Sequence, residues 1–147
     1  MKKILAFSLL AAAASFSGCT KVTVDIPGSK FSGEAVWTRR TLENVRYYNS
    51  DVEAVKAAAI DTCCNELKLY YAGDTPSKYG TELFFCGPKF VKITIDITRR
   101  SPKAPKGSDL PPPQPYTEVA IVYGTWGDLN ASQAIISGIS KRLANEG

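Results

Sequence analysis

Residues 90–98 read FVKITIDIT, and from Val91 onward apolar and polar side chains alternate without interruption. Successive side chains of a β-strand point to opposite faces of a sheet. An antiparallel sheet that is covered on one side only gives this clean alternation. The stretch therefore predicts a strand with one face in the core and the other in solvent. The predicted core face holds Val91, Ile93, Ile95 and Ile97.

Further strands are predicted on both sides of this stretch. Residues 83–86 (LFFC) form a short apolar run that a Gly-Pro pair ends, and residues 116–126 resume the alternation after a proline-rich interruption. Residues 21–26 alternate in the same way and predict a first strand. In residues 34–48, β-branched and aromatic residues favour a long bent strand or a hairpin.

Two helices complete the predicted fold. Ser50-Asp51-Val52-Glu53 matches a capping box, and apolar residues then recur at helical spacing as far as Tyr70. Residues 72–80 have the turn chemistry of a surface loop. A second helix is predicted to begin with Asn130 as its N-cap. Its apolar stripe consists of Ile135, Ile136, Ile139 and Leu143. The sequence thus predicts an α+β fold, a two-layer sandwich in which both helices pack on one face of an antiparallel sheet.

The beginning of the chain has the layout of an export signal. Lys2 and Lys3 precede an apolar run over residues 4–14, which is too short to span a bilayer as a helix. The run leads to Phe16-Ser17-Gly18-Cys19, which resembles the bacterial lipobox, with phenylalanine where leucine is usual. In lipoproteins of that class the cysteine is lipidated and becomes the first residue of the mature protein. The resemblance therefore implies a lipid anchor on Cys19.

This anchor implies a domain organisation and a location. Residues 1–18 would be removed as a signal peptide, residues 19–29 would form the lipidated cysteine with a tether or first strand, and residues 30–147 would form one domain. More than one buried acyl chain holds a protein stably on a membrane. Thr20, rather than aspartate, follows the cysteine. By the sorting pattern of two-membrane bacteria this implies the outer membrane, with the domain facing the periplasm; the inner membrane and the cell surface are the alternatives.

An oxidising envelope favours pairing of the remaining cysteines. The adjacent Cys63 and Cys64 cannot pair within a helix without distorting it, so one of them is expected to bridge to Cys86. We favour Cys63 with Cys86, because Cys63 lies nearer the middle of the apolar helix face; Cys64 with Cys86 is the alternative. Closing this loop of about 23 residues should contribute roughly 3 kcal/mol. The fold is thus predicted to be disulfide-stapled, and the spare thiol could support a disulfide-linked homodimer.

Composition excludes several classes of function. The chain has 18 basic and 14 acidic residues, and removal of the two leader lysines lowers the net charge from +4 to +2. A nucleic-acid binder needs a concentrated basic surface, so no nucleic-acid partner is expected. The chain contains no histidine, which excludes a Ser-His-Asp site, a His-ligated zinc and a His-ligated haem. We expect no enzymatic activity, no cofactor and no metal.

The proline-rich interruption covers residues 101–115 and favours an extended polyproline conformation. Its first interpretation is a variable exposed loop; the sharper alternative is a projecting contact arm, whose basic base would lie near a partner. The candidate partner contacts are Arg99, Arg100, Lys103, Lys106, Pro111, Pro112 and Pro113. The sequence thus predicts a lipid-anchored, non-enzymatic accessory or adaptor subunit of a cell-envelope assembly, with an envelope protein as partner. The alternative is a surface or periplasmic binding protein, such as an adhesin, an inhibitor or a ligand binder.

Overall fold

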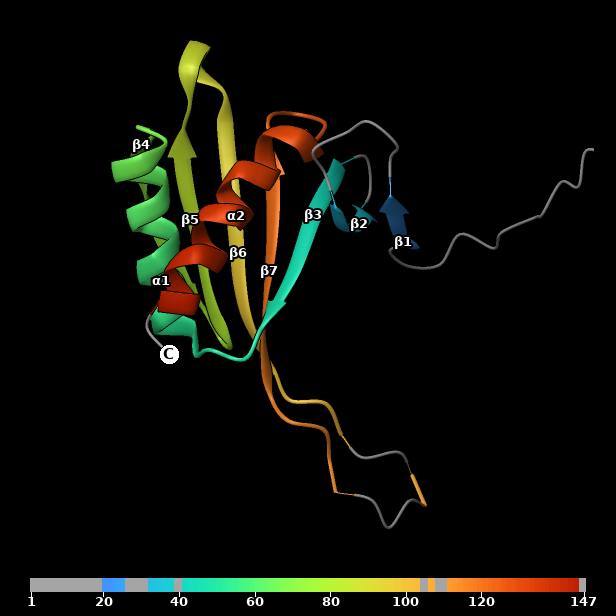
Figure 1. Ribbon diagram of the computed structural model, residues 1–147. Helices are drawn as coiled ribbons and strands as arrows, with labels where there is room; N and C mark the ends of the chain where they lie inside the picture. Colours follow the sequence, from blue (N-terminus) through green and yellow to red (C-terminus); the bar gives the residue numbers. More distant parts are fainter. Residues whose placement is uncertain (1–19, 26–31, 39–40, 104–105, 108–110, 146–147) are drawn as a thin grey trace, which may run out of the picture.

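The computed structural model describes residues 20–25, 32–38, 41–103, 106–107 and 111–145 (Figure 1). The elements within them follow in chain order: β1 (Thr20–Asp25), β2 (Ser32–Thr38), β3 (Thr41–Tyr48), α1 (Val52–Asp61), the π-helical turn η1 (Thr62–Glu66), β4 (Tyr70–Ser77), β5 (Gly80–Cys86), the 3-10 turn η2 (Pro88–Phe90), β6 (Lys92–Arg100), β7 (Tyr116–Tyr123) and α2 (Leu129–Asn145).

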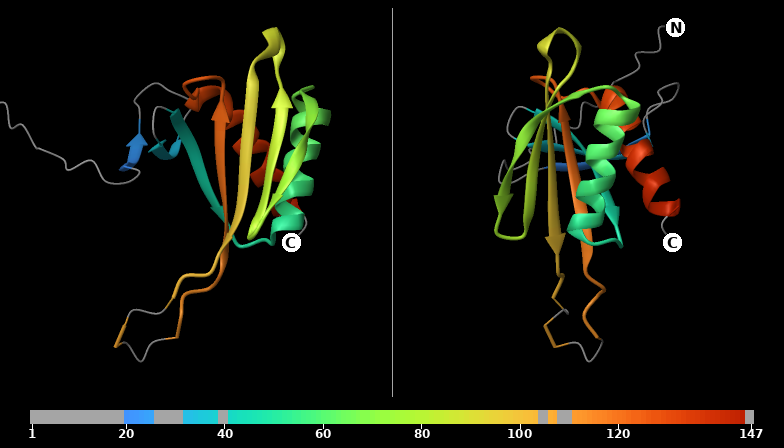
Figure 2. Two further views of the ribbon diagram at one scale, coloured as in Figure 1. Left: turned by 180° about the vertical axis from the view of Figure 1, so that it is seen from behind. Right: turned by 90° about the vertical axis from the view of Figure 1, so that its left-hand side faces the viewer.

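In the described part of the chain, the strands form one seven-stranded sheet in the order β1-β2-β3-β7-β6-β5-β4, and all neighbours are antiparallel. Of the two predictions for residues 34–48, the hairpin is confirmed, because β2 and β3 pair from Glu34 with Val45 to Thr38 with Thr41. Both helices lie on the same side of the sheet (Figure 2). The predicted α+β sandwich of two layers is therefore confirmed.

The core lies between the helices and the middle of the sheet. The predicted alternation is confirmed from Lys92 onward, because Ile93, Ile95 and Ile97 of β6 are completely buried, whereas Val91, which was predicted on the same face, precedes the strand and is only partly buried. From the helix layer, Val55 and Ala59 of α1 reach the same cluster. The stripe of α2 also holds, with Ile135, Ile136 and Ile139 buried and Leu143 packed at the edge of the cluster. Each large apolar side chain buried in this way contributes about 1.5 to 3 kcal/mol.

Four local predictions are wrong, one of them only in part. The first helix does not continue to residue 70, because α1 passes into η1 after Asp61 and the chain then turns into β4. Residues 72–77 are accordingly not a loop but belong to the edge strand β4, and the turn is confined to residues 78–79, before β5 begins at Gly80. The N-cap of α1 is Asp51, whose side chain accepts a hydrogen bond from the Ala54 N–H at 2.8 Å. In α2 the corresponding bond goes from the Ala131 N–H to Asp128 rather than to residue 130.

Candidate functional site

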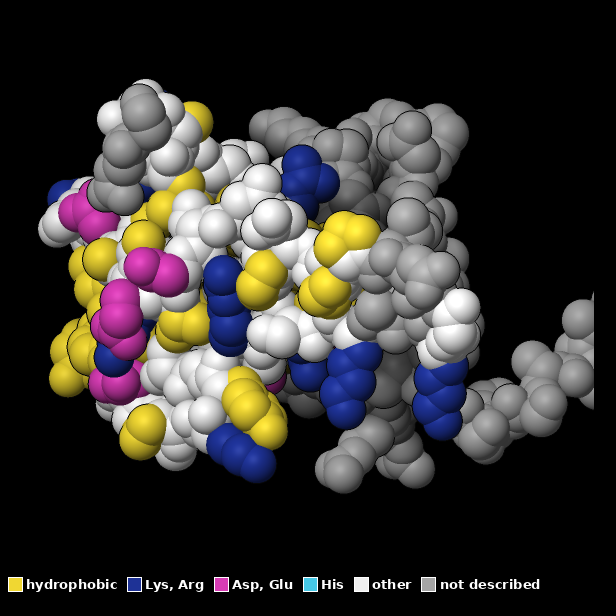
Figure 3. Space-filling view, turned by 90° about the horizontal axis from the view of Figure 1, so that it is seen from below, with side chains coloured by type: hydrophobic (Ala, Val, Ile, Leu, Met, Phe, Trp, Pro, Cys, Tyr) yellow, Lys and Arg dark blue, Asp and Glu magenta, His cyan; other side chains and the backbone are white. Residues whose placement is uncertain are grey.

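The proline-rich arm leaves the sheet where β6 and β7 end their pairing. The last pair joins Arg100 to Tyr116, and the connection beyond it projects away from both layers of the fold (Figure 2). Every side chain in residues 111–115 is exposed, and so are Lys103 and Lys106. Seen from this end, Lys and Arg side chains are spread over the surface, while acidic side chains gather on the α1 side (Figure 3). The described part of the arm thus offers apolar rings and positive charge to solvent.

The two arginines at the base of the arm are occupied within the fold. The Arg99 guanidinium donates to the Ser50 carbonyl and to the Thr117 hydroxyl, both at 3.1 Å. The Arg100 guanidinium forms an ion pair with Glu118 at 2.8 Å. This hydrogen-bonded pairing raises the Arg100 pKa further above its ordinary value. The predicted contact set therefore divides into two arginines that fix the base of the arm and two lysines and three prolines that are exposed.

The sheet face opposite the helices, which we call the open face, carries a shallow polar hollow of about 420 Å³. It is lined by Thr41, Glu43, Glu82, Thr94, Asp96, Ala120 and Val122. Glu82 and Asp96 stand directly opposite each other in the register of β5 and β6, an arrangement of like charges that disfavours strand pairing. Among the described residues, no group of three or more His, Cys, Asp or Glu side chains is placed to hold a metal ion. The open face offers mainly hydrogen-bond acceptors.

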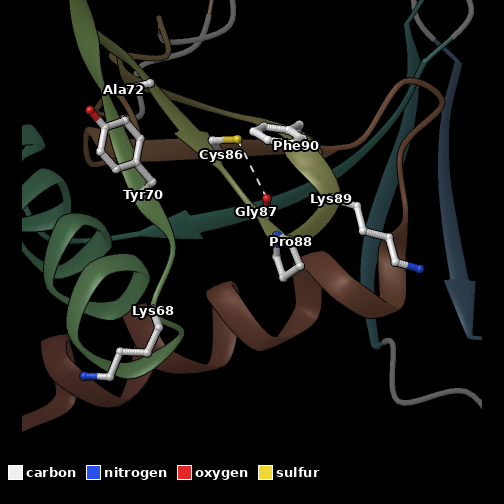
Figure 4. Close-up of a pocket in the computed structure, with 8 residues that line it drawn as sticks. All are labelled: Lys68, Tyr70, Ala72, Cys86, Gly87, Pro88, Lys89 and Phe90. Atoms are coloured by element: carbon white, nitrogen blue, oxygen red, sulfur yellow. Dashed lines mark hydrogen bonds between the residues drawn. The ribbon is translucent and has the colours of Figure 1, made fainter.

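A second hollow, of about 580 Å³, lies at the end of β4 and β5 beside η2 (Figure 4). It is lined by Lys68, Tyr70, Ala72, Cys86, Gly87, Pro88, Lys89 and Phe90. In Figure 4 the two lysines point to opposite sides, away from each other. Tyr70 is 73% exposed and Phe90 is 93% exposed. This hollow is therefore open and apolar, and positive charge stands at its borders.

The backbone around this hollow is strained. Lys68, Lys89 and Phe90 have φ values of 55°, 58° and 60°, and no other residue of the described chain except glycine has a positive φ. The left-handed region disfavours residues other than glycine, asparagine and aspartate. Strained residues cluster at functional sites, where the surrounding structure holds them in place. All three line the same hollow, which marks it as a candidate site.

The predicted bridge between Cys63 and Cys86 is wrong for this structure, in which Cys63, Cys64 and Cys86 are free thiols. Cys63 is completely buried beneath the helix layer. In β5 the side chains alternate, so that buried Phe85 enters the core and the next residue, Cys86, points to the open face. The sheet thus separates the two thiols. Burial raises the Cys63 pKa to about 12, so this thiol stays protonated and acts as a small apolar side chain.

The arm was predicted from its composition, whereas the hollow beside η2 was not. The aromatic residues of the hollow, Tyr70 and Phe90, are of a type that sequence patterns assign to the core. Only the tertiary structure shows that they lie on the surface. Within the described residues, no helix has the length and the apolar character to cross a bilayer. The sequence matches no protein-family model and no curated protein. The candidate sites therefore rest on the geometry of this chain alone.

Proposed function

We propose that the protein is a lipid-anchored, non-enzymatic interaction module of the bacterial cell envelope, an accessory or adaptor subunit that holds an envelope partner through its arm. The observation that carries this proposal is the exposed, proline-rich connection between β6 and β7, which projects beyond the sheet (Figure 2). A polyproline segment is already extended, so binding it orders few torsions. Proline-rich segments are recognised in this way by grooves lined with aromatic side chains.

The base of the arm supports this role because it is rigid. Arg99 ties β6 to Ser50, at the entry to α1, and to Thr117 of β7. The Thr117 hydroxyl also donates to the Ser50 carbonyl at 2.6 Å. A force on the arm would therefore be transmitted to a hydrogen-bonded junction and not to a loose loop. The arm itself contributes little to the core, because its described side chains are mostly exposed.

The anchor is proposed from the lipobox-like sequence alone, since Cys19 lies outside the described residues. Replacing Cys19 with serine should remove the lipid and release the protein into the soluble envelope fraction. Flotation of membranes in a density gradient, with metabolic labelling by a radioactive fatty acid, measures both effects. A Cys19→Ser protein that floats as before would contradict the anchor.

The contact role of the arm can be tested by site-specific photo-cross-linking in living cells. A photoreactive amino acid at Pro112 should give one adduct of defined mass with an envelope protein. The matched control carries the same amino acid at Lys78, an exposed position in the turn after β4, and should give none. Equal adducts from both positions, or none from Pro112, would contradict the adaptor role. Adducts only with molecules from outside the cell would favour the alternative, a surface binding protein.

Shortening the arm separates contact from stability. The partner that cross-links at Pro112 should no longer be recovered with the protein when residues 103–113 are replaced by a tight turn. The melting temperature should stay within about 2 °C of that of the unmodified protein. A large loss of stability would show instead that the arm packs against the fold. The double variant Lys103→Ala, Lys106→Ala should weaken partner recovery most at low ionic strength, and the difference from the unmodified protein should shrink as salt is added, because exposed charges are screened.

A further inference from the structure

We propose that the end of the sheet next to Cys19 rests directly on an anionic phospholipid bilayer, through an aromatic rim formed by Trp37, Tyr70, Phe90 and Trp126. This inference rests on the proposed lipid anchor and goes beyond it. An anchor alone leaves the orientation of the domain open, whereas a docked rim fixes which end faces the lipid and which end faces away.

Strand register places the anchor beside the rim. Thr20 follows Cys19 in the chain and pairs with Trp37 in β2. Neighbouring strands lie about 4.8 Å apart, so Thr20, the residue next to the proposed anchor in the chain, stands directly beside the Trp37 backbone. Trp37 pairs in turn with Leu42, whose N–H donates to the Trp126 carbonyl at 2.8 Å. Both tryptophans of the chain therefore lie near the anchor.

The other half of the rim lies at the same end of the sheet. The Gly124 N–H donates to the Lys92 carbonyl at 2.8 Å, which joins the end of β7 to the start of β6. Lys92 pairs with Cys86, and Cys86 pairs with Tyr70. Phe90 belongs to η2, which connects these strands. In Figure 1 the β5–β6 and β7–α2 connections lie together at the upper end of the sheet, and the arm lies at the lower end.

The exposure of the rim needs a reason that the isolated fold does not provide. Its four members are among the six large hydrophobic side chains that are exposed in the described chain, with exposed fractions from 50% for Trp37 to 93% for Phe90. Phe90 is held outward by a left-handed backbone. Tryptophan and tyrosine favour the membrane–water interface, because their rings are apolar with a polar atom at one position.

The charge at this end favours anionic lipid as the occupant. Lys68 and Lys89 border the hollow beside η2, and the exposed Lys92 follows it. Lysines near a membrane surface are attracted to anionic headgroups. Asp128 lies at the same end, but it is engaged as the cap of α2 through the Ala131 N–H. Because β1 begins immediately after Cys19, little chain is left as a leash, and the rim would be held at the bilayer surface.

The two tryptophans make the docking measurable in the lipidated mature protein. We would reconstitute it in vesicles of phosphatidylethanolamine and phosphatidylglycerol whose acyl chains carry bromine, which quenches nearby tryptophan. The variants Trp37→Phe and Trp126→Phe report on one tryptophan each. Each should lose at least half of its fluorescence relative to vesicles without bromine. The matched control is Tyr79→Trp in the Trp37→Phe, Trp126→Phe background, since Tyr79 is 59% exposed at the arm end.

The outcomes separate the orientation from the anchor. If the mature protein with Cys19 intact carries no lipid and does not float with the vesicles, the proposed function itself is contradicted. If the protein floats but Trp37 and Trp126 stay unquenched, the docked rim is overturned. A rim that binds another protein instead of lipid would give this result. Quenching of the control as strong as that of the rim also overturns it.

The lysines provide a test of lipid charge. In the double variant Lys89→Glu, Lys92→Glu, tryptophan quenching on anionic vesicles should fall at least twofold. On phosphatidylcholine vesicles its quenching should equal that of the unmodified protein. Equal quenching on the anionic vesicles would overturn the preference for anionic lipid. Circular dichroism of each variant confirms that a loss of quenching is not a loss of fold.

Discussion

Replacing Gly138 with alanine should destabilise the protein, although alanine favours a helix over glycine by about 1 kcal/mol. Gly138 lies on the face of α2 that meets Thr62 of η1. A Cβ atom at residue 138 would stand 2.2 Å from the Thr62 Cγ2 and 3.0 Å from its Oγ1. Carbon atoms pack best at about 3.5 to 4.0 Å. The two elements would therefore have to separate by roughly 1.5 Å.

The magnitude follows from the balance of two terms. Overpacking of a well-packed contact costs roughly 1 to 3 kcal/mol, and Thr62 is completely buried, so its methyl group has no free space to enter. A contact at 2.2 Å belongs in the upper half of that range, about 2 to 3 kcal/mol, and subtracting the gain in helix propensity of about 1 kcal/mol leaves a loss of about 1 to 2 kcal/mol. For a domain of this size the melting temperature should fall by roughly 3 to 8 °C. Urea unfolding followed by circular dichroism measures the free energy, with an unchanged m-value.

Two further variants make the result specific. Thr62→Ser removes the Cγ2 atom, so in the Gly138→Ala background it should restore part of the lost stability, with a coupling of about 1 kcal/mol in a double-mutant cycle. Ser137→Ala is the matched control, because Ser137 is the exposed neighbour on α2 and should change stability by less than about 0.5 kcal/mol. A Gly138→Ala protein as stable as the unmodified one would refute the close contact.

The remaining predictions concern acid sensitivity and the thiols. Hydrogen bonds from Arg142 lower the pKa values of Asp61 and Glu66 below their ordinary 3.8 and 4.5, so their stabilisation of the fold is present above about pH 4.5 and is lost as the pH falls through the lowered values. Arg142→Ala should therefore unfold at a lower urea concentration than the unmodified protein at pH 7. An equally large difference in the urea midpoint at pH 3 would contradict this. In the native protein a maleimide should label Cys86 and leave buried Cys63 unlabelled until unfolding, and a peptide map without reduction that links the two would refute their placement on opposite sides of the sheet.

The sequence was most informative where one face of an element is buried. β6 and β7 alternate along their whole paired length, so their existence and their core faces were predictable. β4 was missed because Gly73, Asp74 and Pro76 are turn formers. They are tolerated here because β4 is the edge strand, where proline needs no partner on its outer side. A register shift between Tyr71 and Gly73 further weakens the period of two.

The failed bridge shows how sensitive strand arguments are to one residue. Cys86 ends an apolar run, and the predicted bridge to Cys63 required its side chain to face the core. In β5 only alternate members do so, and Leu83 and Phe85 occupy those positions. A shift of one residue moves a side chain to the other face of a sheet. An apolar run without polar alternation does not show which of its residues face the core, since Phe84 and Cys86 are as apolar as their buried neighbours.

If Cys19 carries the proposed anchor, strand direction places the arm at the opposite end of the sheet from it. β1 and β3 run the same way, because β2 lies antiparallel between them, and β6 also runs this way because β7 separates it from β3. β1 and β6 therefore begin at the same end of the sheet. The arm follows the last residue of β6 and must leave from the other end. Added residues in a polyproline conformation would extend its reach by about 3.1 Å each, and they would do so away from Cys19 without disturbing the strand pairs that join the arm to the core.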